Sequence, residues 1–217
     1  MEAFMAVIVH LAETAFISIL VSGIESFPSK YKGIKKPKIF SREGEVYGLL
    51  FGQRIEKNSD TVFNVTIAIP MQMIESKSPD GVMPSLKHLE RIKSVLESYP
   101  MFQFLGTFHS HPCSREEFNG MKSIDASNDD EESALDDAKE LGEEIIEIII
   151  SITHLQAAPT SKAPDVRWSI TQNYCGNYRY SIAAYCTNTT DQELELVDNF
   201  ICPLAAGVGN YDLNPRS

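Results

Sequence analysis

Residues 102–112 read FQFLGTFHSHP, an apolar run that leads directly into two histidines separated by one serine. The apolar part, Phe102 to Phe108, predicts a short strand. Residues at i and i+2 on an extended backbone point to the same side of the chain, so the imidazoles of His109 and His111 can reach one cation. Pro112 stiffens the exit from this segment. The stretch therefore predicts two metal ligands at the end of a strand.

Helical and extended patterns alternate on both sides of this stretch, which indicates an α/β or α+β fold built on one central sheet. Strands are predicted at Met5–Leu11, Val46–Phe51, Val62–Ile69, Ile145–Ile152, Val166–Ile170, Arg179–Tyr185 and Glu193–Phe200. Helices are predicted at Thr14–Ser26, Leu86–Tyr99 and Ser127–Leu141, and loops at Ser29–Lys38, Ser76–Pro84 and Cys113–Ala126. At 217 residues the chain fits a single domain spanning residues 1–217. We expect the single Trp168 to lie in the core.

The charge of the chain is concentrated in one segment. Of the formal net charge of −11, the stretch from Asp125 to Glu147 contributes −10, with eleven carboxylates against one lysine. This pattern is typical of a solvated helix face. It argues against nucleic acid as a partner, because phosphate binding needs a basic surface.

The sequence predicts a soluble protein of the cytoplasm. The longest uncharged run near the N-terminus, Thr14 to Ile24, is too short to span a bilayer, and no signal peptide is recognisable there. The four cysteines form no CxxC pair and no disulfide framework, which favours a reducing compartment. No membrane partner is expected, and no pattern in the sequence predicts an oligomeric state.

Two further segments carry carboxylates that a metal site with two histidines requires. A catalytic zinc site takes three protein ligands and leaves a position for water. Ser127-Asn128-Asp129-Asp130 offers Asp130 as the third ligand, although a serine followed by an acid three residues later is also a plain helix N-terminus. Upstream, Glu45-Val46-Tyr47-Gly48 precedes an apolar strand, and Glu45 could serve as a base.

Taken together and in this order, the three segments resemble the JAMM (MPN+) zinc metalloprotease family, whose pattern is ExxG, then HS/THP, then SxxD. The resemblance covers roughly Met5 to Ile152. It implies a cytidine-deaminase-like MPN fold with a single mixed central sheet flanked by helices. It also implies that His109, His111 and Asp130 bind Zn²⁺, that Glu45 is the general base and then the general acid, and that Ser127 donates to the oxyanion.

The chain departs from the family pattern after the second histidine. Fifteen residues, Pro112 to Ala126, precede Ser127, whereas the family's usual gap is shorter. Either this segment carries an insertion or the third ligand is Asp125, in which case Lys122 falls at the serine position. Other carboxylates (Asp129, Glu116 and Glu117) stay open as ligands, Ser127 could be only a helix cap, and Cys113 lies close enough to His111 to reach the metal.

By this resemblance we expect a zinc-dependent hydrolase of peptide or isopeptide bonds. Its partner would be a protein substrate with an extended C-terminal tail, such as a ubiquitin-like or sulfur-carrier protein. The alternative is a non-catalytic MPN-type interaction domain, which would lack part of the metal set. A nucleoside deaminase is disfavoured because the chain has no PCxxC pair to complete that family's zinc site.

Overall fold

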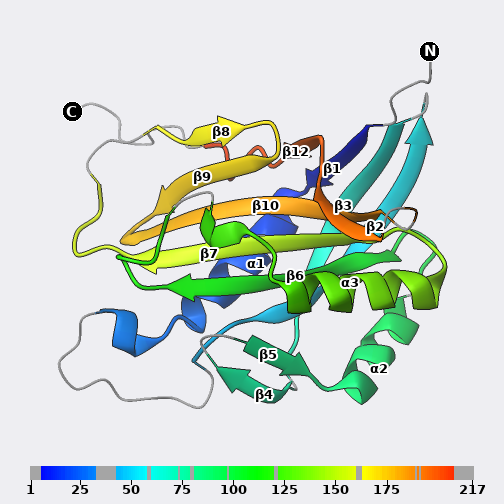
Figure 1. Cartoon of the computed structure of the whole chain (residues 1–217), viewed down its shortest axis with the longest axis horizontal. Coiled ribbons are helices and arrows are strands. Elements are labelled where there is room, and N and C mark those ends of the chain that lie inside the picture. The colour runs from blue at the N-terminus through cyan, green and yellow to red at the C-terminus, as the bar shows by residue number, and fades with distance from the viewer. Residues whose placement is uncertain are drawn as a thin grey trace.

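The computed structural model describes residues 6–32, 43–57, 60–72, 74–78, 81–96, 98–119, 122–159, 163–188, 190 and 192–207. Within them, ten strands form one curled sheet: β1 (Val7–Leu11), β2 (Tyr47–Lys57), β3 (Asp60–Pro70), β6 (Gln103–Cys113), β7 (Ile146–His154), β8 (Asp165–Arg167), β9 (Ile170–Cys175), β10 (Tyr178–Asn188), β11 (Glu193–Leu196) and β12 (Asn199–Ile201). The order is β12-β1-β3-β2-β6-β7-β10-β9-β8, with β11 also paired to β10 (Figure 1).

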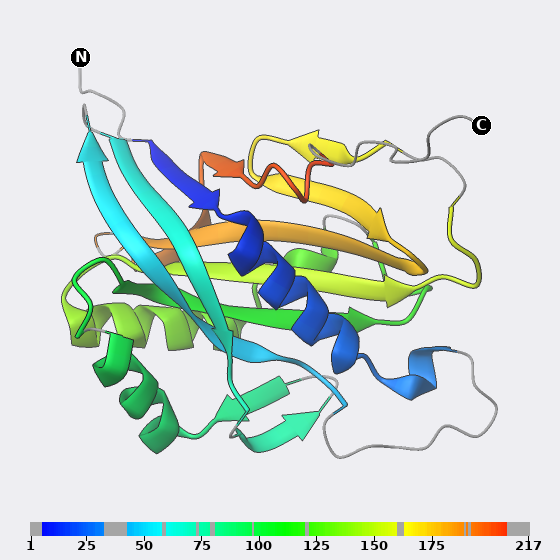
Figure 2. The same ribbon diagram turned by 180° about the vertical axis from the view of Figure 1, so that it is seen from behind.

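The sheet is mixed, because β1 runs parallel to β12 and β3, and β6 runs parallel to β7, while the other pairs are antiparallel. Helices cover both faces. Helix α1 (Glu13–Glu25) crosses one face (Figure 2), and α3 (Asn128–Leu141) crosses the other (Figure 1). Helix α2 (Leu86–Leu96) and the short helices η1 (Ser29–Lys32) and η2 (Lys122–Ile124) complete the helical elements of the described residues. The predicted α/β fold with one mixed sheet is confirmed.

Successive side chains of β7 point to opposite faces of the sheet and so pack in two different hydrophobic clusters. Ile148 and Ile150 pack in the large cluster with α1, which buries Phe16 and Ile19. Ile149, between them, packs against Ile124 of η2 on the opposite face. Because β6 pairs with β7 in parallel register, His109 stands beside Ile149 and Ser110 beside Ile150. The two histidines therefore lie on the face that carries η2 and α3.

Two glycines allow the strands around the histidines to approach closely. Gly106 has φ +143°, which other residues rarely adopt, and a Cβ there would lie 1.8 Å from the Ile146 carbonyl oxygen. At Gly48, the glycine of the ExxG segment, a Cβ would lie 2.2 Å from the Phe108 ring and 2.5 Å from the Ile69 carbonyl oxygen. Gly48 is therefore required for β2 to pack against the strand that carries the histidines.

The prediction of a loop at Ser76–Pro84 is wrong. Strands β4 (Ile74–Ser78) and β5 (Gly81–Pro84) form a separate antiparallel hairpin (Figure 1). A hairpin ladder needs only backbone groups. The polar residues of this segment lack the apolar alternation by which a strand is recognised in a sequence.

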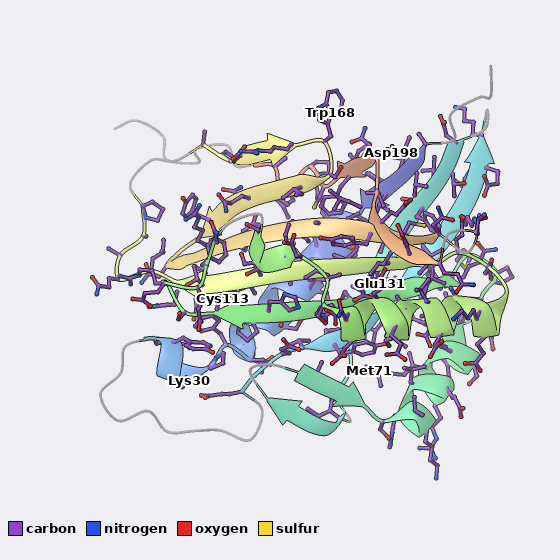
Figure 3. All side chains as sticks on the ribbon, in the orientation of Figure 1. Lys30, Met71, Cys113, Glu131, Trp168 and Asp198 are labelled. Atoms are coloured by element: carbon purple, nitrogen blue, oxygen red, sulfur yellow. The ribbon has the colours of Figure 1, made fainter. Side chains whose placement is uncertain are left out.

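Two late strands were also predicted with wrong bounds. The expected strand Val166–Ile170 turns at Trp168, which is 81% exposed and points away from the sheet (Figure 3), so its prediction as a core residue is wrong. The expected strand Glu193–Phe200 is two strands, β11 on β10 and β12 on β1. The chain passes from pairing with β10 to pairing with β1 at Asp198, whose carboxylate accepts a hydrogen bond of 2.7 Å from the Val7 backbone N–H.

No helix among the described residues is both long and apolar enough to cross a membrane.

Candidate metal centre

Strand β6 does not end at Phe108 but continues through both histidines to Cys113. Between the histidines, Ser110 points to the opposite face and is buried. Its hydroxyl accepts a hydrogen bond of 2.9 Å from the Val46 N–H, and its own N–H donates to the Val46 carbonyl at 2.9 Å. Ser110 thereby fixes the segment before β2 against the histidine strand. Continuing this antiparallel register places Glu45 opposite His111.

Each imidazole is oriented by a hydrogen bond at its Nδ1 atom. His109 Nδ1 lies 2.7 Å from a carboxylate oxygen of Glu147, and His111 Nδ1 lies 3.1 Å from the Ser123 carbonyl oxygen. Both partners are hydrogen-bond acceptors, so each Nδ1 atom carries a proton. The Nε2 atom on the opposite side of each ring therefore points into the site. The two Nε2 atoms lie only 2.8 Å apart.

Asp130 brings a carboxylate to the same point from the first turn of α3. Its Oδ1 lies 3.5 Å from His109 Nε2. Its Oδ2 is held by the Ser127 N–H at 2.8 Å and the Ser127 hydroxyl at 2.7 Å, in a reciprocal capping box. One ligand atom from each of His109, His111 and Asp130 lies within 4.8 Å of the others, and these three could hold a metal ion.

The donor set fits a zinc ion. Two imidazole nitrogens and one carboxylate oxygen are ligands that catalytic zinc sites use. Ligand bonds of about 2.0–2.1 Å in a tetrahedral site place neighbouring donor atoms about 3.3 Å apart. The observed separations of 2.8 and 3.5 Å lie on either side of that value. Imidazoles also suit other transition metals, so the donors alone do not select zinc.

The other carboxylates considered for the third position do not join this group within the described residues. Asp125, Asp129, Glu116 and Glu117 are exposed. The Cys113 thiol, at the end of β6 (Figure 3), lies 3.3 Å from the Ser151 hydroxyl and 3.5 Å from the His111 carbonyl oxygen, and it is not part of the group either.

Glu147 is buried beside the candidate metal donors, so the prediction that the whole acidic stretch is a solvated face is wrong for this residue. One of its oxygens bonds His109, and the other accepts a hydrogen bond from the Thr107 hydroxyl. A signal was present in the sequence, since Glu147 is the one charged residue inside the β-branched run Ile145–Ile152. A carboxylate buried in such a strand needs a partner.

The charges around the histidines set opposite pKa shifts. Burial lowers the pKa of His109, but the hydrogen bond and charge of Glu147, together with Asp130 and Glu45, outweigh it and raise the pKa to about 9. Burial and the positive charge of His109 lower the pKa of His111 to about 4. Burial opposes the ionised form of Asp130, yet His109 and the bonds from Ser127 keep the pKa of Asp130 below its ordinary value.

Replacing Glu147 with glutamine is expected to weaken zinc binding by about 10–100-fold, the usual effect of losing an outer partner of a metal-bound histidine. Glutamine has the same shape but cannot supply the negative charge that makes His109 a stronger donor. Competition with a zinc chelator measures the affinity. Glu143→Gln, the same change at an exposed site, is the control, and equal affinities in the two variants would contradict the role of Glu147.

Zinc affinity is expected to rise by about tenfold per pH unit between pH 6 and 8. Between about pH 4 and pH 9 His109 is positively charged and carries an extra proton on Nε2, while His111 is neutral with its only ring proton on Nδ1. Metal entry displaces the Nε2 proton of His109, so raising the pH favours binding until His109 loses it unaided. The same chelator competition at several pH values measures the slope, and an affinity that does not change over this range would contradict the assignment.

Glu45 is buried and lines a cavity of about 700 Å³. The cavity lies between the C-terminal end of α1, residues 43–47, the end of β3 and the β4–β5 hairpin. Tyr47, Met71, Ile74 and Val82 contribute apolar wall. Its volume is in the range of ligand pockets. Burial raises the pKa of the Cys113 thiol, and the negative charge of Glu45 adds to that shift.

Ser127 acts in the structure as the N-cap of α3. Its hydroxyl accepts from the Asp130 N–H at 3.2 Å and donates to the Asp130 carboxylate. The serine therefore orients the third metal donor, and its hydroxyl must turn away from Asp130 before it can donate to a substrate oxygen.

Comparisons with known proteins assign the chain to no family. No protein-family model matches it, and no curated protein matches it in sequence.

Proposed function

We propose that the protein is a zinc-dependent hydrolase of peptide or isopeptide bonds. The observation that carries this proposal is the convergence of His109, His111 and Asp130, with both imidazoles fixed so that their Nε2 atoms face one point. A buried carboxylate, Glu45, lines the cavity of about 700 Å³ and would supply the base that hydrolysis needs. Convergent donors with a base beside a cavity are typical of metal-assisted hydrolysis.

Each group of side chains has a separate role in the proposed reaction. A zinc ion bound by the three donors would lower the pKa of water to about 7 and polarise a substrate carbonyl. Glu45 takes the proton from the attacking water and then gives it to the leaving nitrogen. Ser127 turns its hydroxyl from Asp130 to the oxyanion, an interaction of the kind worth about 10²–10³-fold in rate.

We further propose that the architecture is that of the MPN/JAMM metalloproteases. The sheet order that sets β2 beside β6, with α3 delivering Asp130 from above the same strand, supports this assignment. On this basis the substrate is a protein with an extended C-terminal tail, such as a ubiquitin-like or sulfur-carrier protein. Such a tail would enter the cavity beside Glu45.

The test is a panel of ubiquitin-like and sulfur-carrier proteins whose C-terminal carboxyl group is joined to a fluorescent amine. The zinc-loaded protein is expected to release the amine from at least one of them. Activity should disappear with a chelator and return with added zinc. Zinc-loaded protein that cleaves no member of the panel but binds one tightly would support the alternative, a non-catalytic MPN-type interaction domain.

A further inference from the structure

A second cavity, of about 270 Å³, lies among β8, β9, β10 and the segment that follows β6, and none of the three metal donors lines it. Figure 1 shows these three strands at one end of the sheet. The walls are mostly polar. Arg167, Gln172, Arg179 and Ser181 come from the strands, and Phe118 and Asn119 from the segment after β6.

The hydrogen bonds around this cavity fix the direction of each donor. One terminal nitrogen of Arg179 donates to the Gln172 side-chain oxygen at 2.7 Å. The side-chain nitrogen of Gln172 then donates a hydrogen bond of 2.9 Å to the hydroxyl oxygen of Ser181. The Ser181 proton therefore needs another acceptor, and none is present among the described residues. Ser181 is fully buried, so bulk water cannot satisfy this donor.

Arg179 adds a second unsatisfied donor. Its Nε atom is buried and has no hydrogen-bond partner, and no acidic side chain pairs with Arg179 in the described part of the chain. The guanidinium carbon lies over the ring of Phe118, 4.9 Å from its centroid, and over the ring of Tyr174, 5.8 Å from its centroid. Contacts with aromatic rings restrict the guanidinium, and its Nε–H is left as a donor without an acceptor.

The charge of the cavity is positive in a strongly acidic protein. Arg167 and Arg179 line it with one acidic residue, Asp165, which forms an ion pair with Arg167 at 3.4 Å. One net positive charge remains. Buried donors without acceptors call for a ligand that brings acceptors, and a single positive charge matches a monoanion.

We propose that this cavity binds a small carboxylate, held by the Arg179 guanidinium and the Ser181 hydroxyl. A carboxylate is planar, carries one negative charge and accepts parallel hydrogen bonds from a guanidinium. The proposal does not rest on the proposed hydrolase activity. Its ligand would contact the segment between β6 and α3 through Phe118 and Asn119.

Titration of the ¹⁵N-labelled protein with acetate tests the proposal, at constant ionic strength maintained with chloride. The Arg179 Nε–H signal, assigned from its loss in Arg179→Lys, is expected to shift and saturate with acetate. Ser181→Ala should weaken acetate binding by about tenfold or more, because a hydrogen bond to a charged group is lost. N-acetyl-aspartate amide presents the same group on a peptide, and the tighter of the two probes identifies the source of the carboxylate.

Gln172→Glu is the sharper variant. The new carboxylate accepts from a terminal nitrogen of Arg179 and from the Ser181 hydroxyl, so it neutralises the arginine charge and satisfies the serine, and it should abolish acetate binding without unfolding the protein. Arg91→Gln, at an exposed arginine of α2, is the control and should bind acetate like the native protein. An Arg179 signal that acetate does not move, or equal affinities in the native protein and the two cavity variants, would overturn the proposal.

Discussion

Replacing Glu45 with glutamine is expected to reduce hydrolysis by about 10²–10⁴-fold while the protein keeps its zinc. The amide cannot take a proton from water at neutral pH, although it fills the same buried position. Zinc should stay bound because Glu45 is not one of the three residues whose donor atoms converge. The turnover of the substrate found with the panel and the zinc content of the same sample measure the two effects.

Glu43→Gln is the matched control for this variant. Glu43 lines the same cavity, but its carboxylate is bonded to the Ser29 backbone N–H and hydroxyl. The Glu43→Gln substitution should therefore reduce hydrolysis only slightly. Full activity in Glu45→Gln would remove the proposed base, and loss of zinc from that variant would show that Glu45 is a ligand instead.

The second large effect is expected at the third metal donor. Asp130→Asn should lower zinc affinity by more than the roughly 10–100-fold that follows loss of an outer partner, because it removes one of three charged or basic donors. Asp125→Asn should leave zinc affinity unchanged, because Asp125 is exposed and outside the donor group. Zinc content after dialysis and chelator competition compare the two variants.

The stability of helix α3 must be measured alongside zinc affinity in Asp130→Asn. Asp130 also closes the capping box of α3, so Asp130→Asn is expected to cost up to about 1 kcal/mol of stability. Circular dichroism during thermal unfolding separates that loss from loss of metal. Zinc kept by Asp130→Asn and lost by Asp125→Asn would mean that the alternative register is correct.

Local patterns predicted the parts of the fold whose signals are local. Helix α3 begins at the Ser127 cap and ends at Gly142, which has φ +71°, and both were readable from the residue types alone. The buried strand β7 followed from its β-branched run. Strands β11 and β12 were merged into one because the bond between Asp198 and Val7 joins residues 191 positions apart.

In the candidate site, too, the residues marked by local patterns were predicted and a partner distant in the sequence was missed. The two histidines, Glu45 and Asp130 were proposed from short segments, and the structure brings the three donors together. Glu147 was missed because eleven carboxylates in one stretch resemble a solvated face, and its partner His109 is 38 positions away. A lone charge inside an apolar strand is the better guide, since burying it without a partner would cost several kcal/mol.

Metal analysis of the purified native protein tests whether His109, His111 and Asp130 form a zinc site. After growth with added zinc and dialysis against metal-free buffer, we expect about one zinc per chain, and we expect a folded His111→Ala variant to lose that zinc. Native protein that is folded but contains no zinc after this treatment would contradict the metal centre at His109, His111 and Asp130.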